Sequence, residues 1–205
     1  ADAVVNLVGI LSGNYEKVHV DGARNVAEAA AQAGCEAMVQ ISAIGADADA
    51  PSAYGRSKAK GEEAVKAAFP GATILRPSIV FGREDEFVNR FAQMVASAPV
   101  VPVIASQTRF QPVYVADVAA AVLAALDDPN AHGGKTYALG GPDIIKMGEL
   151  IRWIAKTIGR DRMIVDLPDG VASMLASMPG TPITTDQLRM LQHDNVVGTQ
   201  PGIAE

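Results

Sequence analysis

Apolar runs alternate with helical patterns in the N-terminal part of the chain. Three β-branched runs, at 3–9, 37–42 and 72–82, lack polar alternation, which predicts strands buried on both faces of a parallel sheet. Apolar residues at helical spacing predict helices between these runs, at 18–34 and 54–69. Strands and helices in this order form βαβ units, which close right-handed with helices on both faces of a sheet. The pattern predicts a doubly wound α/β fold.

The pattern changes after Gly82 and predicts a more mixed second part. It contains helices at 85–97, 117–126 and 145–159 and strands at 110–115 and 136–141, with a Pro-rich irregular piece between the first helix and the first of these strands. We therefore expect residues 1–82 to form a cofactor-binding sheet. Residues 83–205 should supply the last sheet strands and a small α/β lobe on the substrate side.

Two short helices are expected near the C-terminus. Val171, Met174, Leu175 and Met178 share one helical face, which we interpret as packing on its own domain rather than as a docking surface. The segment from Thr184 to Gln187 has the pattern of a capping box and predicts a second helix start.

Composition narrows the class of protein. The chain has 205 residues, 49% of them hydrophobic and 20% charged, as is typical of a soluble globular protein. A net charge of −6 and the lack of an evident Lys and Arg cluster argue against a nucleic-acid partner. Cys35 is the only cysteine and is expected to be a small packed residue, and three scattered histidines predict no metal site.

Neither a membrane span nor a leader is expected. Charged residues or prolines break the longest apolar stretches, and the chain opens on a strand-like run without a starting Met or a signal-peptide pattern. We expect the sequence to be part of a longer protein.

A Tyr and a Lys at the start of one predicted helix are candidates for catalysis. Tyr54 and Lys58 are four residues apart and share a helical face, where an ammonium group would lower the pKa of a phenol toward the useful range. Ser42 ends the preceding strand and would orient a substrate oxygen. Taken alone, the same spacing is also typical of a solvated helix face.

The context of this pair resembles the extended short-chain dehydrogenase/reductase superfamily. Three stretches, AFPGATILRPSIVFGREDEFVNRFA, QPVYVADVAAAV and TTDQLRMLQHDNVV, resemble one atypical branch of it, the NAD(P)H-binding accessory subunits of respiratory complex I and their alphaproteobacterial relatives. The resemblance implies a Rossmann-like sheet that binds NAD(H) or NADP(H), with NADP(H) favoured. The sequence lacks the family's Gly-rich fingerprint, so we expect the N-terminal βαβ unit to be missing.

The resemblance also implies which residues contact the nucleotide. Three strand ends carry them, together with the helical pair: Leu7, Val8, Gly9, Ile41, Ser42, Pro77, Ser78, Tyr54 and Lys58. The strand-end residues also have plain packing interpretations, such as Gly9 in a turn and Pro77 as a strand terminator.

Three positions depart from the active enzymes of the superfamily. Ala43 stands where many of them carry a catalytic hydroxyl, and Phe110 stands where an Arg grips a sugar-nucleotide diphosphate, with Arg109 adjacent. These departures disfavour nucleotide-sugar substrates. His19 replaces a common Asn and is interpreted either as a partly exposed residue at a helix start or as a proton-transfer group.

Two functions remain open. In the leading hypothesis the nucleotide is mainly structural, and the partners implied by the resemblance are complex I subunits, in the cytoplasm or at the inner face of the respiratory membrane. In the alternative the chain is an active NAD(P)-dependent oxidoreductase or epimerase on an alcohol or ketone, with Tyr54, Lys58 and Ser42 as its catalytic residues. The charged piece at 83–90 is either a solvated helix surface or a partner contact.

Overall fold

The computed structural model describes residues 1–178 and 183–198, which form two compact units. The first unit contains Ala1–Ser78, Val115–Gly140 and the two described residues from Val197. The second contains Ile79–Tyr114 and Gly141–Val196. The chain leaves the first unit after Ser78, close to the boundary expected at residue 82. It returns to this unit at Val115 for two helices and the last strand of the sheet.

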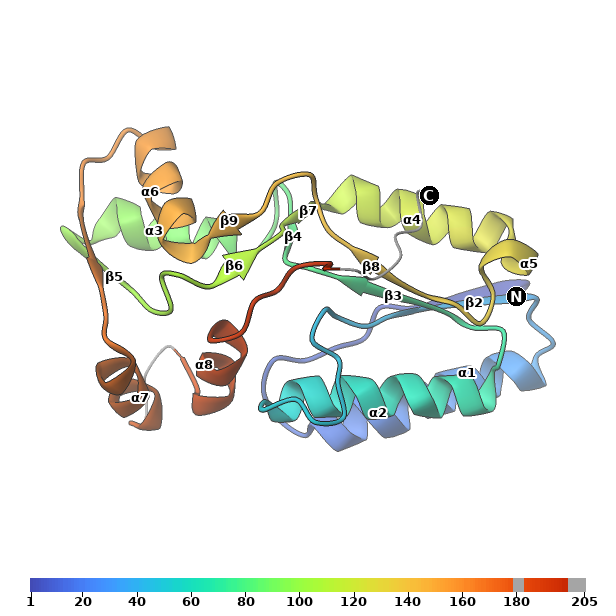
Figure 1. Cartoon of the computed structure of the whole chain (residues 1–205). Helices are drawn as coiled ribbons and strands as arrows, with labels where there is room; N and C mark the ends of the chain where they lie inside the picture. The colour runs from blue at the N-terminus through green and yellow to red at the C-terminus, as the bar shows by residue number, and fades with distance from the viewer. Residues whose placement is uncertain (179–182, 199–205) are drawn as a thin grey trace. The chain divides into compact units, whose positions relative to one another are not determined.

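A four-stranded parallel sheet forms the centre of the first unit. The strands β1 (Ala3–Asn6), β2 (Ala37–Ile41), β3 (Thr73–Pro77) and β8 (Thr136–Leu139) pair in the order β1-β2-β3-β8. Figure 1 shows α1 (Ala23–Gln32) and α2 (Ala53–Ala68) on one face of the sheet and α4 (Val115–Asp127) on the other. The short α5 (Pro129–His132) follows α4. The predicted doubly wound α/β fold is confirmed.

The first strand differs from its prediction. β1 is an edge strand that ends at Asn6, and Asn6 is its only buried residue. The Asn6 side-chain oxygen accepts the Val8 N–H at 3.1 Å, a local bond that turns the chain out of the sheet. Residues 7–9 therefore leave the strand and are exposed, although they had been expected to continue it.

The core between α1 and the sheet is built largely from small residues. Ala23, Ala27 and Ala30 of α1 are buried against Met38 and Ile74 of the sheet. Small side chains let the helix approach the strands closely, and Cys35 is half-buried at the edge of this core, as expected.

A π-helix, η1 (Glu16–Gly22), precedes α1 and changes which residues face the core. In it the buried residues are His19 and Val20, while Val18 is half-buried. A Cβ on Gly61 of α2 would lie 2.2 Å from the His19 carbonyl oxygen, so only glycine allows α2 and η1 to approach this closely.

The second unit contains three two-stranded sheets and a separate core. β4 (Val80–Phe81) pairs with β7 (Val113–Tyr114), β5 (Val100–Val103) with β10 (Met163–Asp166), and β6 (Arg109–Phe110) with β9 (Ile145–Lys146). The strands predicted at 72–82 and 110–115 are thus each divided in two. The helices α3 (Val88–Ser97) and α6 (Met147–Thr157) pack on this core, and the apolar face of α6 is buried from Met147 to Ile154.

The two C-terminal helices form as expected, but the first of them packs through a different face from the one that the sequence indicates. α8 (Thr185–Leu191) begins with the predicted capping box of Thr184 and Gln187. In α7 (Asp169–Ser177) the buried residues are Ala172 and Ala176, while Val171, Met174 and Met178 are exposed. The interpretation that this apolar stripe packs on its own domain is wrong, because the small alanine face makes the contact instead.

Candidate functional site at the carboxyl ends of three strands

The predicted site residues converge where β1, β2 and β3 end. Lys58 of α2 is buried, and its Nζ donates a hydrogen bond to the Ile41 carbonyl oxygen at the end of β2, at 3.1 Å. A Cβ built on Gly9, beyond the end of β1, would lie 3.6 Å from the same Nζ. The carboxyl ends of parallel strands are where α/β folds bind ligands, so the location fits a binding site.

The start of α2 is fixed by a local cap that places Tyr54. The Ser52 hydroxyl accepts the Gly55 N–H at 3.1 Å, so the helix begins at Ala53 and Tyr54 stands one turn before Lys58. Tyr54 is half-buried, and its ring meets the His19 ring edge-on with centroids 5.4 Å apart. Tyr15 stacks on His19 at 5.3 Å and meets the Tyr54 ring edge-on at 6.0 Å, which completes an aromatic trio.

The pKa of Tyr54 is raised rather than lowered. Burial, followed by the nearby Tyr15 phenol, raises the pKa of Tyr54 to about 12. Burial lowers the pKa of Lys58, and the Glu62 carboxylate opposes that shift. The expectation that the ammonium of Lys58 brings the Tyr54 phenol into the neutral range is therefore wrong for the protein without a ligand, because desolvation outweighs the neighbouring charge.

Ser42 belongs to a buried polar network. Its hydroxyl donates to Glu62 Oε1 at 2.5 Å, and Glu62 accepts two further bonds from Arg76, from Nε at 2.9 Å and from Nη2 at 2.7 Å. The hydrogen bonds that Arg76 donates to Glu62 are the main reason that the pKa of Arg76 is raised. Because the Ser42 hydroxyl donates its hydrogen bond to Glu62, it could donate to a substrate oxygen only after this bond is broken.

His19 has a structural role that neither sequence interpretation anticipated. Its Nε2 accepts the Ile10 N–H at 3.0 Å, so the neutral ring carries its proton on Nδ1, which donates to Ser57 Oγ at 2.8 Å. Burial, followed by the positive charge of Lys58, lowers the pKa of His19 to about 4. The ring is buried, neutral and fully bonded, which disfavours proton transfer and rules out the partly exposed location.

The remaining strand-end residues divide into an exposed and a buried group. Leu7, Val8 and Gly9 form an exposed, mostly apolar stretch after β1. Pro77 and Ser78 are buried at the end of β3, where the Pro77 carbonyl accepts the Ile44 N–H at 3.0 Å and the Ser78 N–H donates to the Leu139 carbonyl at 2.8 Å.

Phe110, one of the positions that disfavour sugar nucleotides, and its neighbour Arg109 make contacts within the second unit. Phe110 is buried in the core of this unit. Arg109 holds Asp194 in a fork, with Nη2 to Oδ2 at 2.6 Å and Nε to Oδ2 at 2.8 Å. The Arg109 guanidinium is thus already paired with a carboxylate of its own unit.

Sequence reasoning missed three residues of the site. Tyr15, Ser57 and Glu62 make ring contacts or hydrogen bonds with residues singled out in the sequence but belong to no motif recognised there. Glu62 could have been found from its spacing, because it stands four residues after Lys58 on the same helix face.

Comparisons with known proteins identify homologues of two kinds, subunits of NADH dehydrogenase and a reductase. The chain is 38% identical over 183 residues to a mitochondrial protein of Arabidopsis thaliana, NADH dehydrogenase (ubiquinone) 1 alpha subcomplex subunit 9, a match covering 86% of this chain and 46% of the relative. The mouse protein of that name is 35% identical, with 100% and 57% covered. A ceramide reductase of Caulobacter vibrioides is 31% identical, with 82% and 54% covered. The chain spans about half the length of the curated relatives it matches.

Solved structures of extended short-chain dehydrogenase/reductase enzymes share the fold. A dTDP-4-dehydrorhamnose reductase of Clostridium acetobutylicum superposes with a TM-score of 0.73 at 23% identity, covering 99% of this chain and 78% of the enzyme. The Bacillus anthracis enzyme of the same name, solved with NADP, has a TM-score of 0.71 at 20% identity, with 98% and 77% covered. A model of the RmlD substrate binding domain matches residues 12–172, and the chain belongs to that family.

Proposed function

We propose that the protein binds a nicotinamide nucleotide at the carboxyl ends of β1, β2 and β3, and that this nucleotide serves mainly to stabilise a subunit of a larger respiratory assembly. NADP(H) is favoured over NAD(H) by the family resemblance. The observation that carries the proposal is Lys58, a buried ammonium group beside Gly9 whose one hydrogen-bond acceptor among the described residues is the Ile41 carbonyl oxygen.

A buried ammonium with a single acceptor is poorly solvated and has donors to spare. Lys carries three N–H donors, and burial already lowers the pKa of Lys58. Ribose hydroxyls would supply the acceptors that Lys58 lacks within its own unit. The neighbouring Leu7 and Val8 would place an apolar surface, now exposed, against the rest of the nucleotide.

Two features favour a retained nucleotide over turnover. A bound nicotinamide can exchange hydride with a substrate, but this chemistry needs a partner that donates or accepts a proton. With a pKa of about 12, Tyr54 stays protonated and cannot accept a proton at neutral pH, and the Ser42 hydroxyl already donates to Glu62, so the oxidation of an alcohol is disfavoured. The relatives named as mitochondrial NADH dehydrogenase subunits support association with a respiratory complex. No helix in the described ranges is long and apolar enough to cross a membrane.

An active reductase is the second candidate, favoured by the match to ceramide reductase. A phenol with a raised pKa stays protonated at neutral pH and can donate its proton to a carbonyl oxygen. In this function Tyr54 is the acid, Lys58 binds ribose, and Ser42 leaves Glu62 to orient the substrate.

The test is to purify the protein in its natural full length, denature it and identify any released nucleotide by mass spectrometry. Lys58→Met should abolish retention, because it removes the ammonium while preserving a long side chain. Lys60→Met, on the exposed side of the same helix, is the matched control and should retain the nucleotide, as should Tyr54→Phe.

The other outcomes decide between the candidates. Little retained nucleotide, with substrate-dependent oxidation of added NADPH that Tyr54→Phe abolishes, would establish the reductase. Equal retention in Lys58→Met and the wild type would remove Lys58 from the site and overturn the proposed binding mode.

A further inference from the structure

A concentration of positive charge lies at the end of α6 and in the turn that follows it. Residues 152–162 contain four basic residues and one acidic residue, a local charge of +3 in a chain whose net charge is −6. This cluster is not evident from the sequence pattern, because two of the basic residues lie on α6 and the other two lie beyond its end.

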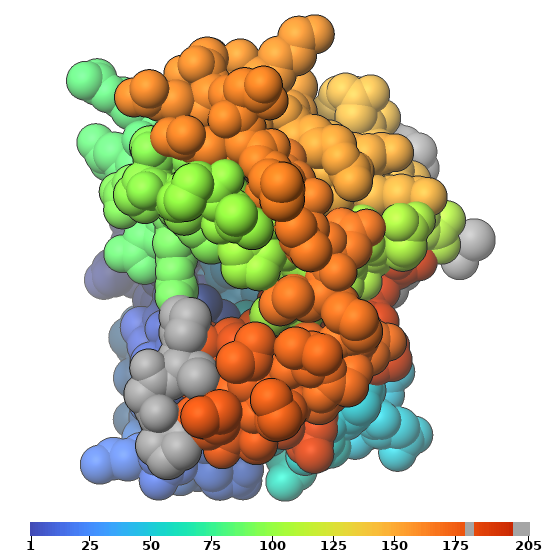
Figure 2. Space-filling model, turned by 90° about the vertical axis from the view of Figure 1, so that its left-hand side faces the viewer, coloured from blue at the N-terminus to red at the C-terminus, as the bar shows by residue number. Residues whose placement is uncertain are grey.

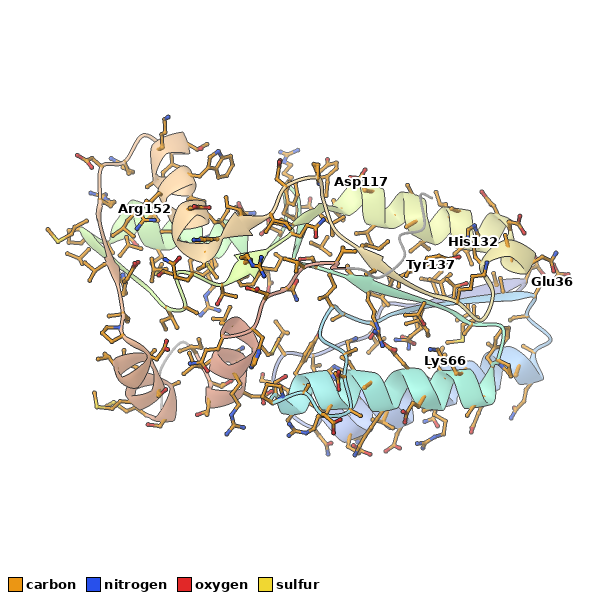
Figure 3. The ribbon with its side chains drawn as sticks, in the orientation of Figure 1. Glu36, Lys66, Asp117, His132, Tyr137 and Arg152 are labelled. Atoms are coloured by element: carbon orange, nitrogen blue, oxygen red, sulfur yellow. The ribbon has the colours of Figure 1, made fainter. Side chains whose placement is uncertain are left out.

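The fold gathers these charges around one shallow hollow. The hollow has a volume of about 620 Å³ and is lined by Arg152, Lys156, Arg160 and Arg162, together with small residues and Asp161. Arg152 projects from α6 (Figure 3). The chain reverses at Gly159, where φ is 66°, and this turn brings Arg160 and Arg162 back beside the helix.

One of the four cations is used within the unit. Arg162 donates from Nε to the Val95 carbonyl at 2.9 Å and from Nη2 to the Ala96 carbonyl at 3.0 Å, which satisfies the C-terminal end of α3. Within residues 1–178 and 183–198, Arg152, Lys156 and Arg160 form no ion pair with a carboxylate. These three charges are therefore available to an external anion.

Large apolar side chains stand beside these cations in water. Trp153 is 55% exposed on α6, next to Arg152 in the chain and one turn before Lys156, and Met163 is 66% exposed at the start of β10. Ile158, in the turn, is also exposed. In Figure 2 the orange segment that carries α6 and this turn lies on the surface facing the viewer.

We propose that this basic and aromatic surface docks on a bilayer that contains anionic phospholipids. Lys and Arg attract lipid phosphates, while a Trp ring settles at the level of the headgroups, a combination typical of proteins that lie on a membrane. A soluble phosphate compound would account for the charges but not for the exposed Trp153 and Met163. The surface lies entirely within the second unit, so this proposal does not depend on the nucleotide site.

The protein carries its own reporter for this surface. Trp153 is the only tryptophan of the chain, so tryptophan fluorescence reports on this face alone. Vesicles of phosphatidylcholine with about one third phosphatidylglycerol should shift its emission to the blue, and vesicles of phosphatidylcholine alone should shift it much less. Added salt should weaken the binding, because screening shortens the reach of the three cations.

Charge reversal at the surface separates docking from general attraction. The variant Arg152→Glu/Lys156→Glu/Arg160→Glu should bind the anionic vesicles about 100-fold more weakly or worse, since each basic residue strengthens such binding by about fivefold. The matched control, Arg83→Glu/Lys135→Glu/Arg189→Glu, makes the same change in net charge at exposed positions elsewhere and should keep most of the binding. Far-ultraviolet circular dichroism checks that both variants are folded.

Three results would overturn the proposal. They are no blue shift with anionic vesicles, equal loss of binding in both triple variants, and a blue shift produced by inorganic phosphate without any lipid. The last of these would assign the hollow to a soluble anion instead.

Discussion

Two arginine forks, one in each unit, have nearly the same closest distance between charged atoms but different surroundings. Arg76 holds Glu62 with its closest contact at 2.7 Å, and Arg109 holds Asp194 with its closest contact at 2.6 Å. The side chains of the first pair are 21% and 4% exposed, and those of the second pair are 55% and 38% exposed.

The difference shows that a short distance alone does not reveal what an ion pair contributes. An exposed pair is screened by water and salt and typically contributes little to stability. In a buried pair, loss of one partner leaves the other charged and poorly solvated, so the pair becomes indispensable even where its net contribution is modest. Glu62 is also bonded to Ser42, so the buried fork ties the end of β2 to α2 and β3.

Removing Glu62 should have the largest effect. Glu62→Ala leaves Arg76 and the Ser42 hydroxyl without their partner, and we expect the free energy of unfolding to fall by roughly 3–5 kcal/mol. Urea unfolding measures this change, and Asp194→Ala serves as the counterpart in the exposed fork. Equal losses in the two variants would show that burial does not separate the forks.

Acid should weaken the surroundings of His19 in the first unit and the Arg109–Asp194 fork in the second unit in different pH ranges. The pKa of His19 is about 4 in the folded protein against 6.5 for the free side chain, so the unfolded chain takes up a proton first as the pH falls. Stability that is present above pH 6.5 should be lost progressively down to pH 4, by roughly 3 kcal/mol. The pKa of Asp194 is lowered by Arg109, so the contribution of the exposed fork should be lost only below its ordinary value of 3.8.

Urea unfolding at several pH values, with His19→Asn as the comparison, measures this effect. The variant should be less stable at neutral pH and should lose most of the pH dependence between pH 6.5 and 4. A variant that keeps the full dependence would assign it to another group.

Salt should produce the smallest effect and should act on the exposed fork. The stability difference between the wild type and Asp194→Asn should shrink as sodium chloride is added, because ions screen exposed charges. The difference between the wild type and Glu62→Gln should hardly change with salt. Thermal unfolding at low and high salt compares these two stability differences. A strong salt effect for Glu62→Gln would contradict the conclusion that the Arg76–Glu62 fork is shielded from solvent.

Local features of the sequence were predictable, and contacts between distant residues were not. The capping box at Thr184 and the α2 helix that carries Tyr54 and Lys58 depend on neighbouring residues, and both form as expected. The bond between Ser42 and Glu62 joins residues 20 positions apart, and no spacing rule predicts it. The burial of His19 depends on a π-helix, whose irregular phase is invisible to a test for regular helical periodicity.

The close approach of Gly61 to the His19 carbonyl also limits how the chain can vary in length. Deleting one residue from η1 would rotate the preceding helical residues by about 100° relative to those that follow. His19 would then turn away from Ser57, and the loop held through Ile10 would lose its anchor. Related sequences that keep glycine at position 61 should therefore tolerate substitutions in this helix far better than insertions or deletions.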